Sequence, residues 1–115
     1  MSPEHSLSIA GTLLLILALL LSACAPKHYA EVHEDSIAFY YECPDAAEVL
    51  FASSIDRYHF HPAHKVNDDT WEVIVPREKS FSYFYLVDDK LSLPVCTLTV
   101  LDDFGARNCL FVSEM

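Results

Sequence analysis

Hydrophobic residues are arranged in two different ways along the chain. Residues 7–23 contain no charged side chain and include the unbroken apolar run 13–21, whereas the rest of the chain alternates short apolar and polar stretches. A period of two residues is typical of strands that bury one face. The pattern therefore separates a leading apolar segment from a β-rich remainder.

The β-rich part contains clear strand and turn signals. Residues 70–75 alternate, with Trp71 and Val75 on one face, and residues 81–87 alternate in the same way before a hairpin-turn signal at residues 88–89. Short strands separated by turn signals, without a helical pattern, predict an all-β chain folded as a β-sandwich of about seven short strands. The clearest strands are expected at residues 37–41, 49–52, 70–75, 81–87, 90–93 and 109–112.

The apolar run ends in a processing motif. Residues 21–24 (Leu-Ser-Ala-Cys) resemble the lipobox of bacterial lipoproteins, in which small residues admit the signal peptidase and the cysteine thiol receives a lipid. One departure is that residues 1–6 contain no Lys or Arg. An uncleaved anchor is the alternative, because about 20 apolar residues can span a bilayer. We expect residues 1–23 to be a lipoprotein signal peptide and Cys24 to carry the lipid.

The expected lipid places the domain at a bacterial cell envelope membrane. Residues 24–36 are polar and show neither helical nor strand periodicity, so they are predicted to be a lipidated tether before a domain at 37–115. Ala25 directly follows the modified cysteine, which resembles outer-membrane sorting in enteric bacteria. We therefore expect a lipid-anchored protein at the periplasmic face of the outer membrane.

Charge and motif content limit the function classes. The chain has 17 acidic and 7 basic residues, a formal net charge of −10. Nucleic acid is not expected as a partner, because binding a polyphosphate requires a basic surface. No nucleophile elbow or metal motif is visible, and one small domain cannot enclose a substrate, so we expect no enzyme and no cofactor.

A metal site is not expected. His59, His61 and His64 place three imidazoles within six residues, which could suit zinc or copper. Paired acids at 68–69, 88–89 and 102–103 could suit calcium. Loop positions explain the histidines and turn chemistry explains the acids without an ion.

Three cysteines remain beside the lipidated Cys24. Disulfides persist in an exported chain, and Cys43, Cys96 and Cys109 allow three pairings. We favour Cys96 with Cys109, which would contribute about 3 kcal/mol by restricting the unfolded chain. Cys43 would then be a buried thiol or an intermolecular partner.

Six motifs in a fixed order resemble one family. The matching residues are 37–46, 48–58, 61–65 against His-Pro-Met-x-Lys, 69–76 against Gly-x-Trp-Glu-x-x-Val-Pro, 83–89 against Tyr-x-Phe-x-Val-Asp-Gly, and 102–108 against Asp-Asp-x-Gly-x-x-Asn. They resemble the family-48 carbohydrate-binding module, the glycogen-binding domain of the AMP-activated protein kinase β subunit and of glycogen-branching enzymes. The resemblance implies an immunoglobulin-like sandwich with a sugar site on one face.

The resemblance also implies which residues bind the sugar. Asn108 coincides with the family's sugar-binding Asn, and Tyr58 stands at its first platform Trp. Phe84 stands where the kinase subunit has a Lys, and Leu91 stands where it has the second Trp. Phe104 replaces an aliphatic residue that pins the sugar chain. The ligand contacts are therefore only partly retained.

Two non-catalytic functions follow from these replacements. The first is binding of an α-glucan or another oligosaccharide. The second is a protein-interaction module, with an envelope protein as its partner, that kept the fold and exchanged its sugar contacts for an apolar patch of Phe84, Leu91 and Phe104. Convergence of Tyr58 and Asn108 on one concave face would favour the sugar, whereas a flat apolar patch would favour a protein.

Overall fold

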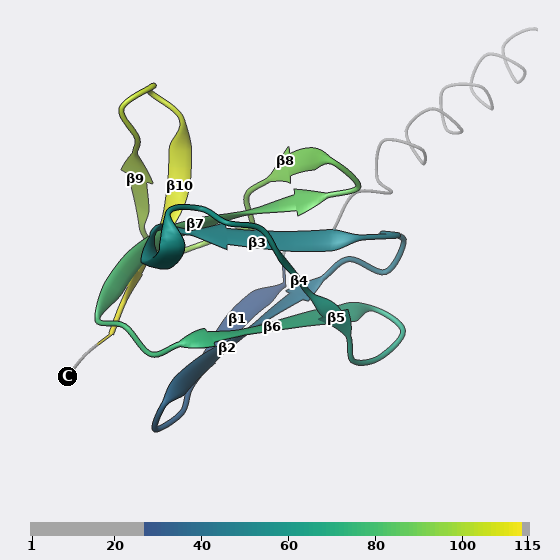
Figure 1. The fold of residues 1–115 in the computed structure, drawn as a ribbon. Coiled ribbons are helices and arrows are strands. Elements are labelled where there is room, and N and C mark those ends of the chain that lie inside the picture. Colours follow the sequence, from purple (N-terminus) through teal and green to yellow (C-terminus); the bar gives the residue numbers. More distant parts are fainter. Residues whose placement is uncertain (1–26, 114–115) are drawn as a thin grey trace, which may run out of the picture.

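The chain folds as two packed β-sheets. A computed structural model describes residues 27–113, which form ten strands and one 3-10 turn (Figure 1). No helix in this part of the chain is long and apolar enough to cross a membrane. The predicted signal peptide and Cys24 lie outside the described residues. The elements are β1 (His28–Val32), β2 (Ser36–Glu42), β3 (Val49–Ser53), η1 (Ser54–Asp56), β4 (His61–Pro62), β5 (His64–Lys65), β6 (Thr70–Pro76), β7 (Ser80–Val87), β8 (Lys90–Ser92), β9 (Thr99–Leu101) and β10 (Arg107–Val112).

The strand order agrees with the immunoglobulin-like layout. One sheet has the order β1-β2-β6-β5, and the other has β4-β3-β7-β10-β9, with β8 paired to β7 (Figure 1). The first sheet matches the four-stranded sheet of that fold, and β3-β7-β10 match the facing three strands. The predicted all-β sandwich is therefore confirmed.

The strand number differs from the prediction, because ten strands are present where about seven were expected. The strands that the sequence did not predict are β1, β4, β5 and β9. Three of these, β4, β5 and β9, have only two or three residues. A segment of that length is too short for a period of two to be recognised.

Aromatic side chains fill the space between the sheets. The inward residues of β6 are Trp71, Val73 and Val75, which are all buried as the alternation predicted. Phe39 on β2 lies at the centre, with ring centroids 5.2 Å from Phe51 and 4.9 Å from Tyr83. Since alternate residues of β7 face this core, the residues between them face outward.

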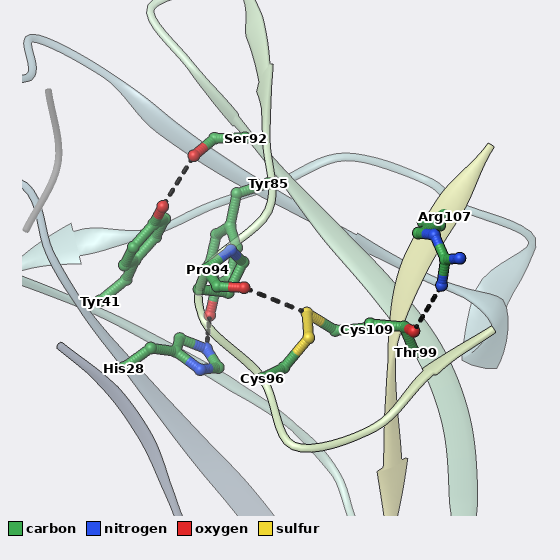
Figure 2. Close-up of a disulfide and its surroundings, with 9 residues drawn as sticks. All are labelled: His28, Tyr41, Tyr85, Ser92, Pro94, Cys96, Thr99, Arg107 and Cys109. Carbon is green, nitrogen blue, oxygen red and sulfur yellow. Dashed lines mark hydrogen bonds between the residues drawn. A yellow bond between two sulfur atoms is a disulfide. The ribbon is translucent and has the colours of Figure 1, made fainter. Parts of the chain in front are cut away.

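The predicted tether is wrong over His28–Val32, because these residues form the edge strand β1. β1 pairs with β2 in antiparallel register from His28 opposite Tyr41 to Val32 opposite Ile37. The inward residue at its start is an imidazole, so an apolar alternation did not reveal the strand. His28 Nε2 is hydrogen-bonded to the Tyr85 hydroxyl at 2.9 Å, well inside the sandwich (Figure 2).

The predicted disulfide between Cys96 and Cys109 is confirmed (Figure 2). Cys109 is fully buried on β10, and the two Cα atoms are 5.9 Å apart. Cys43 was predicted to be either a buried thiol or an intermolecular partner. Cys43 is buried, but the prediction of a free thiol is wrong, because the residue is disulfide-bonded. Its partner is not among the described cysteines, since the other two are joined to each other.

Candidate functional site

A hollow of about 420 Å³ lies on the outward face of the second sheet. Alternation along β7 directs Ser82 and Phe84 to this face, opposite to the core residues of the same strand. Asn108 on β10 and Val100 on β9 are paired residues across the neighbouring strands. The hollow is lined by Tyr58, Ser82, Phe84, Val100, Leu101, Asp102, Asp103, Phe104 and Asn108.

Tyr58 is held in the hollow by an unusual backbone. Arg57 and Tyr58 both have positive φ, 60° and 64°, which reverses the chain directly after η1. A bulky residue in this region costs on the order of 1–3 kcal/mol, and such strain is concentrated at functional sites. The Tyr58 N–H donates to the Ser53 carbonyl at 2.7 Å, and these contacts keep the turn in place.

The Tyr58 ring forms a pair with Phe84. The two rings are stacked, with centroids 5.7 Å apart and an interplanar angle of 21°. The Tyr58 hydroxyl is also hydrogen-bonded to the Ser82 hydroxyl at 2.5 Å. The stacking contact and the hydrogen bond therefore hold the Tyr58 ring in one orientation. A ligand that binds this ring loses little additional side-chain entropy.

Asn108 is the buried polar group of the hollow. Its side chain is 5% exposed and makes no hydrogen bond within residues 27–113. Its amide atoms are not among the fully buried polar atoms that lack a partner, so they keep contact with solvent through the hollow. Since the amide can both donate and accept, it is free to bind adjacent hydroxyl groups of a ligand.

The loop between β9 and β10 forms the rim. The Asp102 carboxylate accepts the N–H groups of Phe104 and Ala106, both at 2.9 Å, and Gly105 turns the chain with φ 83°. Phe104 is 96% exposed at the tip of this loop. The loop thus has a defined backbone but presents an aromatic ring to solvent.

Four of the five predicted ligand-binding residues come together in the hollow: Tyr58, Phe84, Phe104 and Asn108. The fifth, Leu91, does not line it. Leu91 lies on β8 opposite Leu86, further along the same outward face, and is 60% exposed. The hairpin carries it away from the hollow, so the expected second platform is not part of this site.

Five lining residues were not predicted from the sequence, although the sequence patterns pointed to three of them. Ser82 shares the alternating face of Phe84, and Asp102 and Asp103 belong to the loop motif that led to Asn108. Val100 and Leu101 had no such signal, because β9 was not predicted.

The structure does not bring the three neighbouring histidines of the sequence together. His61 on β4 contacts the Asp56 carboxylate, and this hydrogen bond holds the pKa of Asp56 below its usual value. His59 instead contacts the Asp56 carbonyl, and His64 lies on β5 in the other sheet. Within residues 27–113 no group of three or more His, Cys, Asp or Glu side chains is placed to hold a metal ion.

No family model matches the chain, and no curated protein matches it significantly. The geometry of the hollow and the motifs in the sequence are therefore the features that indicate a function.

Proposed function

We propose that the chain is a non-catalytic carbohydrate-binding module of the glycogen-binding type, anchored at a bacterial envelope by a lipid on Cys24. The observation that carries the proposal is the Asn108 amide, which makes no hydrogen bond within residues 27–113 and opens to the hollow beside the stacked rings of Tyr58 and Phe84. This concave arrangement is the one that favours a sugar over a flat protein contact.

The hollow supplies both kinds of contact that a sugar ring needs. The C–H face of the ring stacks on an aromatic plane, for which Tyr58 and the exposed Phe104 are available. The amide of Asn108 and the hydroxyl of Ser82 then bind ring hydroxyls. The size of the hollow falls within the range of small-molecule sites.

The envelope location is supported by the lipobox motif and by the disulfide. Cys96 and Cys109 are joined, and such bonds persist in oxidising compartments outside the cytosol. The acidic chain, with a formal net charge of −10, is repelled by anionic head groups, so a covalent lipid suits its attachment to a membrane.

Calorimetry on the full chain tests the proposal. The protein is purified in a detergent without a sugar head group, because a maltoside would compete, and is titrated with glycogen, maltoheptaose and envelope polysaccharides. We expect saturable binding that is lost in Tyr58→Ala and in Asn108→Ala. Leu91→Ala is the matched control, since Leu91 is exposed on the same face but outside the hollow. Failure of every glycan to bind would remove the carbohydrate function.

A protein-interaction module is the second candidate function. It is favoured by the exposure of Phe104 (96%) and Leu101 (59%) at the rim. A photo-crosslinking residue at position 104 would then join the chain to one envelope protein in living cells. A Phe104→Ala substitution should abolish that complex without changing the unfolding temperature.

A further inference from the structure

The charged groups of the hollow all have the same sign. Asp102 and Asp103 line it, and none of its nine lining residues is a lysine or arginine. Neither carboxylate has an ion-pair partner within residues 27–113. Any ligand of the hollow therefore meets two uncompensated negative charges.

The two carboxylates differ in their hydrogen-bond partners. One oxygen of Asp102 is occupied by two backbone N–H groups, so this residue mainly shapes the loop. Asp103 is exposed and makes no such contact, which leaves its carboxylate available to a ligand. The neighbouring cation, Arg107, instead donates to the Thr99 hydroxyl at 3.2 Å (Figure 2).

We infer that the glycan bound in this hollow carries a free amino group, which pairs with Asp103 while the sugar ring contacts Tyr58 and Asn108. This inference rests on the proposed carbohydrate function and names its ligand class. Asn108 is largely buried, and its unpaired amide opens to the hollow, which indicates that a polar ligand enters there; the exposed carboxylate of Asp103 indicates the charge of that ligand.

Three classes of glycan differ in their charge interaction with Asp102 and Asp103. An anionic sugar, such as a uronic acid or a sugar phosphate, is repelled by both carboxylates and finds no cation to pair with. A neutral sugar gains one hydrogen bond to Asp103, whereas an ammonium group gains that bond and an attractive charge interaction. An ammonium group is also attracted by the faces of Tyr58 and Phe84.

The test compares three hexasaccharides with the full chain in a sugar-free detergent at low salt. Glucosamine hexamer and cellohexaose share their linkage and differ in one substituent per ring, amine against hydroxyl. Maltohexaose reports whether the site binds an α-glucan. Because an exposed charge pair is weak, we expect glucosamine hexamer to bind about fivefold more tightly than cellohexaose, with the ratio falling as salt is raised.

Two substitutions assign the preference. Asp103→Asn keeps the shape of the side chain and should bring the affinity ratio close to one. Asp68→Asn removes the same charge at an exposed position outside the hollow and should leave the ratio unchanged.

If maltohexaose or cellohexaose binds through Tyr58 and Asn108 but glucosamine hexamer binds no more tightly, the amine inference is overturned and the carbohydrate function stands. Glucosamine binding that survives Tyr58→Ala and Asn108→Ala shows general attraction to an acidic surface, which also overturns the inference. No binding by any hexasaccharide overturns both.

Discussion

Acid should weaken the fold through one imidazole. His28 lies between the sheets, where its ring is 5.9 Å from Phe39 and 5.7 Å from Tyr83, and burial lowers its pKa from 6.5 to about 4. The unfolded chain therefore takes up a proton first as the pH falls. The stability that the neutral imidazole contributes is present above pH 6.5 and is lost between pH 6.5 and about 4. One pKa unit corresponds to about 1.4 kcal/mol, so the full loss is about 3 kcal/mol.

Urea unfolding of the wild type and of His28→Phe, each at pH 7.5 and pH 4.5, measures this effect. Phenylalanine fills a similar space among the aromatic rings but does not titrate. The carboxylates contribute equally to both proteins, so the difference between their two pH responses isolates His28. We expect the wild type to lose about 2 to 3 kcal/mol more than the variant. Equal pH responses would refute the assignment of a buried, neutral imidazole.

Three further predictions concern the backbone and the cysteines. Arg57→Gly should raise the free energy of unfolding by about 1 kcal/mol, because glycine adopts a positive φ without strain, and an unchanged urea midpoint would contradict this. Replacing both Cys96 and Cys109 by serine should lower the free energy of unfolding by roughly 3 kcal/mol, and equal urea midpoints of the two proteins without a reducing agent would contradict this. Peptide-mass analysis of the wild type should find a thioether lipid on Cys24. A disulfide between Cys24 and Cys43 in its place would contradict lipidation, because one sulfur cannot form both bonds.

The fold could be predicted where strands are long enough to alternate. β6 and β7 have seven and eight residues, and their inward and outward faces followed directly from the sequence. β1 was missed because its inward position is His28, a residue that counts as polar in any pattern but is accommodated here by aromatic neighbours. β9 was missed because three residues carry no period.

The site was predicted in part, for a different reason. Tyr58, Phe84, Phe104 and Asn108 are far apart in the sequence, and only the resemblance to a known family suggested that they meet. Leu91 was grouped with them by the same reasoning, but its place in the hairpin depends on strand register, which motif matching does not provide. The missing partner of the Asn108 amide cannot be seen in any sequence, since it depends on which neighbours the fold brings close.

The disulfide ties most of the hollow into one covalent ring. Six of the nine lining residues lie between Val100 and Asn108, inside the ring that Cys96 and Cys109 close. When these thiols are reduced the ring is open, and the segment is held by the pairing of β9 with β10 and by its turn contacts. The redox state of a bond outside the hollow would therefore influence how well its lining is ordered, and the affinity of any ligand should be higher in the oxidised protein.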